Sequence, residues 1–334
     1  MGILSRTPPN FFAAPFGFTG LAGTWLVLSR TANAPRGVSA ALYVLAAAVW
    51  LVLLVGYLAR VTTTRGRLMA DLRDPVLSPF VSVIAIVAMQ LGVGLHSYAP
   101  RTATVVVDVA LVVVIGLGGW LTGQWMTGAP DQDKFHPGYL LPTVAGGLVA
   151  SAAATTVGQP GLGRLCFGIG IVCWLVIGSL MLQRLFFRPP LPTPLVPTMA
   201  IEVAPAPVAG LAWFALTPAP DTLAFGLAGY TILMTLAQIR LIPIYLRTPF
   251  TPGFWAFTFS YAAVATLAIR WLAVERPPAQ QALSWLIALL LTALIGAIAV
   301  RSVIALVQRT YFPPPPPPPP PPATTTAPES GHPR

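Results

Sequence analysis

Hydrophobic residues along this chain gather into ten long stretches that short polar loops separate. The stretches fall at residues 11–29, 38–61, 75–98, 101–127, 135–156, 162–187, 195–216, 221–246, 250–274 and 279–308. Most of them reach the roughly 20 residues that an α-helix needs to cross a bilayer. The first is short, but no small-residue cleavage site followed by a soluble domain marks it as a signal peptide. The pattern predicts an all-α integral membrane protein with ten transmembrane helices.

Every second stretch carries a proline near its start. These prolines are Pro15, Pro79, Pro142, Pro197 and Pro252, and successive ones are 55 to 64 residues apart. That spacing is the length of a hairpin of two membrane-spanning helices with its connections, so we expect five hairpins. A proline inside a helix kinks it, and a membrane tolerates this where neighbouring helices or a water-lined cavity satisfy the freed carbonyl. Five kinked helices therefore predict a central pore, with the unbroken helices outside it.

Composition agrees with a membrane protein. Hydrophobic residues make up 55% of the chain and charged residues only 8%, and the mean hydropathy is +0.75. The net charge of +10 is spread over short loops, which favours contacts with membrane lipids over nucleic acid. Cys166 and Cys173 are about 10 Å apart along one helix, and the three histidines fall in separate segments. We therefore expect no metal, redox centre or other cofactor.

Basic residues predict the orientation of the chain. If both termini are cytoplasmic, 13 basic residues lie inside and six lie outside. The six outer ones are Arg30, Arg36, Arg101, Arg164, Arg270 and Arg276. The positive-inside rule then favours this orientation in a plasma, or bacterial inner, membrane. The loop from Arg60 to Arg73 contributes most, and we interpret it as a topology anchor in preference to a ligand site.

The ends of the chain differ from its middle. We divide it into a cytoplasmic segment at 1–10, a ten-helix domain at 11–311 and a proline-rich cytoplasmic tail at 312–334. Residues 313–322 are ten consecutive prolines, which predict a polyproline II rod leading into disorder. The rod is either a spacer or a docking ligand for a proline-binding partner. We favour the spacer, because a homopolymer lacks the flanking basic residue that sets docking direction.

Acidic residues are few, and most lie in loops. The chain shows no clustered acids, Ser/His pair or His-rich motif of the kind that membrane enzymes use, so we do not expect an enzyme. Only Asp108 and Glu202 lie inside predicted spans, where an ionisable residue is a functional candidate by default. For Asp108 we favour an interfacial or paired structural role. Glu202 either faces the pore or fills hydrogen-bonding vacancies left by Pro205 and Pro207.

Three segments resemble one known family. They are Phe11–Trp25, Pro189–Pro205 and Phe254–Ser260, and the resemblance covers roughly residues 11–311. The family is that of tellurite-resistance and dicarboxylate transporters, which includes bacterial tellurite-resistance anion channels, plant slow-type anion channels, and fungal malate and sulfite permeases. The resemblance implies five hairpins about a pseudo-fivefold axis, odd spans lining the pore, and commonly a homotrimer in which each protomer has its own pore.

The same resemblance implies a gate. The family motif of a phenylalanine that plugs the pore reads Phe254-Trp255-Ala256-Phe257-Thr258-Phe259 here, so the gate maps to Phe259. Spacing alone places Phe259 on one helical face with Trp255 and Pro252, and an aromatic stripe of this kind is more often packing. The candidate pore-lining residues are Gly20, Pro79, Pro142, Pro197, Glu202 and Pro252.

These features favour a channel or carrier for small inorganic or organic anions. The predicted pore spans contain Arg270 near an outer end and no lysine, so selectivity would come from weak positive potential, helix ends and pore width. The alternative is a proton-coupled dicarboxylate carrier, or a sulfite or tellurite efflux carrier, in which Glu202 titrates. The identity of the anion does not follow from the sequence.

Overall fold

The computed structural model of the protein describes residues 7–128 and 131–311. Every regular element within these ranges is helical. Ten helices there are long and apolar enough to cross a membrane, and their boundaries lie within three residues of those predicted from the sequence. The predicted ten-helix membrane fold is therefore confirmed. The expectations for residues 1–6 and for the 312–334 tail lie outside the described residues.

The ten spans form an inner and an outer set. The inner helices are α1 (Ala13–Thr31), α4 (Ser78–Leu95), α6 (Gly146–Thr156), α9 (Pro205–Leu216) and α11 (Ala256–Glu275). The outer ones are α2 (Arg36–Thr63), α5 (Pro100–Gly128), α7 (Pro160–Cys173) with α8 (Ser179–Phe187), α10 (Thr222–Arg247) and α12 (Gln280–Val307). In an 18-residue apolar window of each inner span 56 to 83% is buried, against 11 to 33% in the outer spans. The outer helices therefore present their apolar side chains to lipid.

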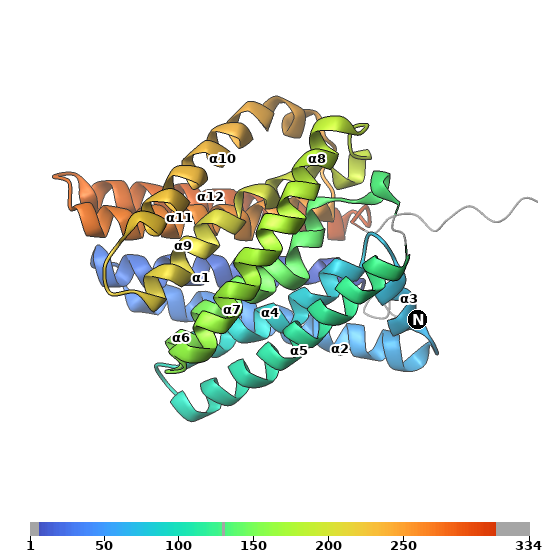
Figure 1. The fold of residues 1–334 in the computed structure, drawn as a ribbon, viewed down its shortest axis with the longest axis horizontal. Coiled ribbons are helices and arrows are strands. Elements are labelled where there is room, and N and C mark those ends of the chain that lie inside the picture. Colours follow the sequence, from blue (N-terminus) through green and yellow to red (C-terminus); the bar gives the residue numbers. More distant parts are fainter. Residues whose placement is uncertain (1–6, 129–130, 312–334) are drawn as a thin grey trace, which may run out of the picture.

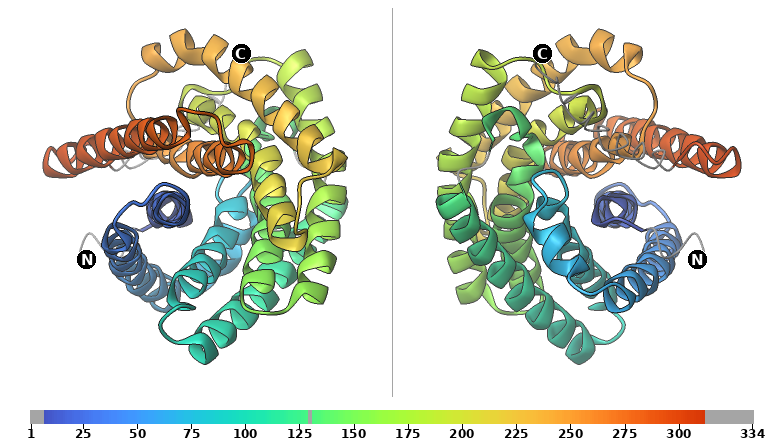
Figure 2. Two further views of the ribbon diagram at one scale, coloured as in Figure 1. Left: turned by 90° about the vertical axis from the view of Figure 1, so that its left-hand side faces the viewer. Right: turned by 90° about the vertical axis from the view of Figure 1, so that its right-hand side faces the viewer.

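The inner helices close into a ring. Each packs against its two neighbours in the order α1, α4, α6, α9, α11 and back to α1. Each also packs against the outer helix that follows it in the chain, as the hairpin pattern predicts. Figure 2 looks along the bundle and shows this arrangement, with α2, α5, α7, α10 and α12 on the outside. Figure 1 shows the helices from the side, with α1 and α12 nearly horizontal and the α7–α8 span and α10 crossing them obliquely.

The prolines do not kink continuous helices, so this part of the sequence interpretation was wrong. Pro15 and Pro79 lie in the first turns of α1 and α4, and Pro252 opens a short 3-10 helix, η8 (Pro252–Trp255). Pro142 lies in a π-helical segment, η5 (Leu141–Ala145), and Pro197 lies in an unusually long 3-10 helix, η7 (Thr193–Val203). A first turn has no intrahelical acceptor for the missing N–H, which suits Pro15, Pro79, Pro142 and Pro252, whereas Pro197 lies inside η7. The end of the ring that they mark is called the proline end below.

The remaining described elements are short. Helix α3 (Arg67–Arg73) follows α2, and the 3-10 helix η2 (Pro9–Phe12) precedes α1. The 3-10 helices η3 (Gln132–Lys134) and η4 (Pro137–Leu140) lead into η5, and the π-helical η6 (Trp174–Gly178) joins α7 to α8. Irregular backbone at membrane depth is usually enclosed by protein, and η4, η5 and the second half of η7 are largely buried here. The π-helical η6 differs, because Leu175 and Val176 are exposed on the outside of the bundle.

A close contact between two glycines holds the third hairpin together. A Cβ atom on Gly147 of α6 would lie 2.8 Å from the backbone nitrogen of Gly170 on α7 and 3.1 Å from the carbonyl oxygen of Cys166. Because these atoms belong to the backbone, they cannot move aside without separating the helices. We expect Gly147→Ala to lose about 1–3 kcal/mol of stability, measured as a lower melting temperature in detergent. Gly168→Ala on α7 is the control, since nothing lies within 4 Å of its Cβ position. Equal melting temperatures for the two variants would contradict this.

Candidate functional site

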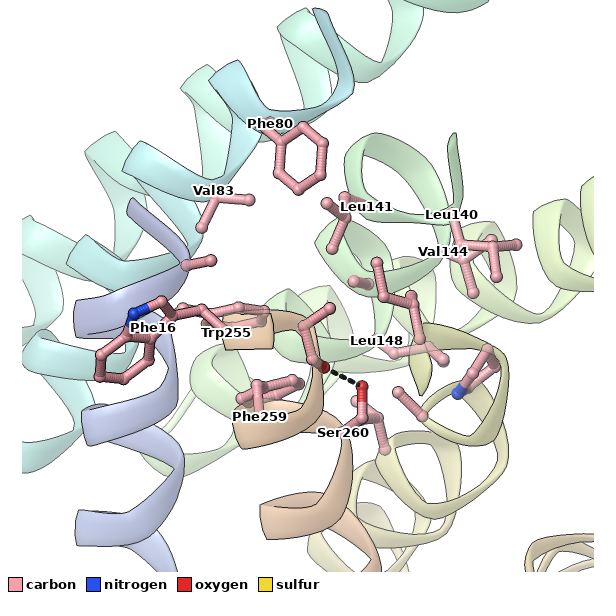
Figure 3. A pocket seen from close by; sticks show the side chains of 17 residues that line it. Phe16, Phe80, Val83, Leu140, Leu141, Val144, Leu148, Trp255, Phe259 and Ser260 are labelled. Atoms are coloured by element: carbon pink, nitrogen blue, oxygen red, sulfur yellow. Dashed lines mark hydrogen bonds between the residues drawn. The ribbon is translucent and has the colours of Figure 1, made fainter. Parts of the chain in front are cut away.

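A small cavity lies on the ring axis towards the proline end. Its volume is about 40 Å³, which is room for very few water molecules. All five inner spans contribute to its lining, which Figure 3 shows from close by. The side chains labelled there are Phe16, Phe80, Val83, Leu140, Leu141, Val144, Leu148, Trp255, Phe259 and Ser260.

This cavity is called the lower axial cavity, or lower cavity, below. It offers an ion almost no hydrogen-bonding group. The Ser260 hydroxyl donates to the Ala256 carbonyl at 2.9 Å, and the Trp255 indole N–H donates to the Ser302 hydroxyl at 2.9 Å. The other labelled side chains are apolar. A constriction of this kind blocks ions by excluding water.

A second cavity lies on the same axis, on the other side of Phe259. Its volume is about 250 Å³, and it too is lined by all five inner helices. Its polar lining side chains are Thr19, Arg30, Tyr43, Gln90, Thr156, Thr266 and Arg270. Thr19 is hydrogen-bonded to Gln90, and Thr266 to Thr24 at 2.8 Å. The end of the ring that holds Arg30 and Arg270 is called the arginine end below.

The second cavity, called the upper axial cavity or upper cavity below, is electropositive. Arg30 and Arg270 lie close enough to interact with one another electrostatically, and no Asp or Glu lines either axial cavity. Neither arginine forms an ion pair with any residue that the structure describes. Two uncompensated guanidinium groups beside an enclosed space favour the entry of an anion.

Phe259 separates the two cavities. It and Val208 are the two residues that line both. Its ring stacks on that of Phe16 from α1, with centroids 3.7 Å apart and planes 15° apart. Stacking and close packing hold the ring across the axis.

Gly20 makes room for this ring. A Cβ atom there would lie 3.1 Å from the Cδ2 atom of Phe259 and 2.9 Å from the Cβ atom of Ala262. A side chain at position 20 would therefore push against both the ring and α11. The absence of a side chain on Gly20 lets α1 approach the helix that carries the ring.

Two of the sequence-predicted site residues, Gly20 and Phe259, line the axial cavities. The four candidate prolines do not appear in either lining, and they lie instead in the opening turns of the inner spans. Trp255 shares the lower cavity with Phe259, but Pro252 does not. Pro252 and Trp255 are three residues apart in η8, where positions i and i+3 lie on one face, so Pro252 lies one turn nearer the proline end than this part of the cavity wall.

Glu202 lies in η7 but lines neither axial cavity, whereas its neighbour Ile201 does. It is 6% exposed, and its Oε1 atom has no hydrogen-bond partner among the described residues. It is close enough to Tyr230 and Tyr245 of α10 to interact with them electrostatically. The carboxyl group is thus buried near the interface between η7 and α10. Asp108, the other acid inside a span, accepts a hydrogen bond from Gln159 at 3.2 Å.

The sequence interpretation did not assign to the site three residues that line the axial cavities: Phe16, Arg30 and Gln90. Phe16 was visible in the family-like opening segment, but its partner ring lies some 240 residues away in the chain. Arg30 was counted as a loop residue, whereas α1 extends to Thr31 and brings it to the cavity. Gln90 carried no sequence signal beyond being a polar residue within an apolar span.

The histidines and cysteines take no part in the axial cavities. Within the described ranges, no three His, Cys, Asp or Glu residues come together as a metal site would require. His136 is fully buried, and its Nδ1 atom accepts a hydrogen bond from the Gly138 N–H at 3.1 Å. Burial lowers the pKa of His136 to about 4, so it is a neutral cap for η4 at physiological pH.

Comparison with known proteins agrees with this geometry. The family model SLAC1, described as "Voltage-dependent anion channel", matches residues 6–303. A tellurite resistance protein TehA homolog from Haemophilus influenzae is 29% identical over 263 residues, covering 78% of this chain and 80% of that protein. The S-type anion channel SLAH2 of Arabidopsis thaliana is 23% identical over 321 residues, covering 93% of this chain and 61% of the plant channel.

An uncharacterized transporter, MJ0576 of Methanocaldococcus jannaschii, is 23% identical over 293 residues, covering 79% of this chain and 83% of its own length. The matched region of the family model contains all ten spans except the last residues of α12. The resemblance seen in the sequence is thereby confirmed, and the chain belongs to the SLAC1 family of membrane anion channels and transporters.

Proposed function

We propose that small anions cross the membrane along the axis of the inner ring, from the arginine end through the constriction at Phe259 to the proline end. The observation that carries the proposal is the position of Phe259, which lines both axial cavities and stacks on Phe16 between them. In this structure the path is closed, and opening requires the ring to move. The chain would act as a channel or transporter and not as an enzyme.

Selectivity for anions would come from Arg30 and Arg270 in a cavity that no carboxylate lines. The test is the reversal potential of currents through the purified protein in planar bilayers with unequal salt on the two sides. We expect it to follow the anion gradient, and to shift when chloride is replaced by nitrate or malate. A reversal potential that follows the cation gradient would contradict the proposal.

A proton-coupled carrier is the alternative, and the buried carboxyl group of Glu202 with its unpartnered Oε1 atom is the observation in its favour. This mechanism predicts that Glu202→Gln abolishes the pH dependence of anion uptake into proteoliposomes, because the amide keeps the shape but cannot titrate. A structural role predicts instead a lower melting temperature with the pH profile retained. A stable variant with an unaltered profile would eliminate the carrier mechanism that uses this residue.

We also propose that the protein lies in a plasma or inner membrane with both termini cytoplasmic. The proline end would then face the cytoplasm, with the loop between α2 and α4 on that side. Asp71 there pairs with Arg60 at 3.4 Å and with Arg67 at 3.1 Å, and this supports a structural anchor.

The orientation has a direct test. The exposed Thr63 ends α2 at the proline end, so a cysteine introduced there should react with a membrane-impermeant thiol reagent only from the cytoplasmic side. The cysteine is introduced into a variant in which the native Cys166 and Cys173 are replaced, so that the reagent finds no other thiol. Labelling of this cysteine from outside intact cells would show that the orientation is the opposite of the one proposed.

The family resemblance also supports a homotrimer in which each protomer has its own pore, and this assembly is part of the proposal. The proline run lies outside the described residues, and its role as a spacer or as a docking ligand remains a prediction.

A further inference from the structure

A third cavity lies beside the axial pathway, between α1, α2 and α4 at the arginine end. Its volume is about 790 Å³. Its wall includes Val44 of α2, whose side chain is 69% exposed, so the cavity borders the lipid-facing surface. It shares Leu26, Arg30 and Tyr43 with the upper axial cavity. These three residues border both spaces.

The mouth of this side cavity is cationic. Arg30 lies near the end of α1, and Arg36 begins α2. Neither forms an ion pair or a hydrogen bond with another residue in the described part of the chain, and no acid lines the cavity. Tyr98, which is 72% exposed, also lines the cavity near the end of α4, the position that aromatic residues prefer at a membrane surface. An anionic group would find two free guanidinium partners there.

The deeper part of the cavity is apolar. Ala47 lies eleven residues beyond Arg36 on α2, which is about 16 Å along the helix axis. Val44 and Leu91 also line the cavity away from its mouth, whereas Leu95 ends α4 nearer the mouth. A small hydrated anion gains nothing from this apolar wall, because it would lose water without finding a polar partner. A molecule with a negative head and a hydrocarbon chain satisfies both parts.

We propose that the side cavity binds an anionic phospholipid, with its phosphate at Arg30 and Arg36 and one acyl chain between α2 and α4. The two arginines would favour an anionic headgroup by charge complementarity, and burial of the acyl chain would contribute hydrophobic binding energy. Because Arg30 also lines the axial cavity, the lipid phosphate offsets its charge where anions enter. Anionic lipid would therefore lower the anion current. This consequence rests on the proposed function, whereas lipid binding does not.

The experiment measures binding without transport. The purified full chain in detergent is mixed with phosphatidylglycerol or with phosphatidylcholine, and bound lipids are counted by native mass spectrometry alongside the melting temperature. We expect phosphatidylglycerol to be retained and to raise the melting temperature more than phosphatidylcholine does. Arg36→Gln should lose at least half of this difference, and Arg36→Lys should keep more of it.

Matched variants test the two parts of the cavity. Arg101→Gln is the control for charge, because Arg101 also lies at the arginine end but lines none of the three cavities. It should bind phosphatidylglycerol as the native protein does. Ala47→Trp fills the apolar part and should weaken the binding of lipid.

Three results would overturn the proposal. The first is full phosphatidylglycerol binding in both Arg36→Gln and Ala47→Trp. The second is an equal stabilisation by inorganic phosphate alone, which indicates a small-anion site. The third is stabilisation by oleate but not by phosphatidylglycerol, which assigns the site to free fatty acids. None of these results bears on currents through the axis, so failure here is distinguishable from failure of the proposed function.

Discussion

Phe259→Ala should raise anion conductance on the order of tenfold or more. The substitution removes the ring that separates the two axial cavities, and it joins them into one water-filled path. A tenfold change needs a barrier lower by only about 1.4 kcal/mol, which is small beside the cost of driving an ion through an apolar constriction. The measurement is single-channel or macroscopic current in planar bilayers, with chloride, nitrate and malate as charge carriers.

The matched control is Phe257→Ala, two residues earlier on the same helix. The Phe257 side chain is buried, its ring stacks on that of Tyr261, and it lines neither axial cavity. Its removal should cost about 3–5 kcal/mol of stability and open no path. Only Phe259→Ala should therefore raise the current. A well-folded Phe259→Ala protein with native currents for all three anions would show that the ring does not close the pore.

Arg270→Gln should lower anion current and weaken the preference for anions over cations. Arg270 lines the upper axial cavity but not the side cavity, so its removal tests the pathway alone. A unit charge about 8 Å from a permeating ion contributes about 1 kcal/mol at an intermediate dielectric constant, which corresponds to roughly fivefold in occupancy. The effect should shrink as ionic strength rises, because salt screens the charge over about 10 Å at 0.1 M.

Arg164→Gln is the control for this charge, since Arg164 lies on α7 and lines neither axial cavity. It should leave current and selectivity unchanged. The double variant Arg30→Gln with Arg270→Gln should lose more than either single one, because both side chains face the same cavity. If the anion current depends on salt concentration identically in the native protein and in Arg270→Gln, then Arg270 does not contribute to selectivity.

Most of the fold could be predicted from the hydrophobic pattern of the sequence. Span lengths and the repeat of prolines indicate five hairpins, because bilayer thickness fixes the number of residues per crossing. The five regularly spaced prolines mark the inner set, but proline alone does not, because the exposed Pro243 lies inside the outer helix α10. The motif around Phe259 located the constriction through the family resemblance and not through its spacing.

Side-chain directions in the irregular segments could not be predicted. Ile201 lines the lower cavity while Glu202 does not, and both lie in the 3-10 helix η7. A 3-10 helix turns 120° per residue and an α-helix turns 100°, so an extrapolated face drifts by a full quarter turn within five residues. The contact of Phe16 with Phe259 depends on ring closure between the first and the last hairpin, which no local pattern encodes.

The ring of five helices sets a scale for the pore. Neighbouring helix axes in contact are about 8–10 Å apart, which places five axes on a circle of about 7–8 Å radius. Each helix with its side chains has a radius of about 5–6 Å, so only about 2 Å remains around the central axis. The five-membered ring is thus just wide enough for a small ion where the facing residues are small, as at Gly20, Ala204, Ala256 and Ala262. In the proposed pathway, permeability would therefore depend on the volume of the side chain at each level of the ring, and one large residue would suffice to close it.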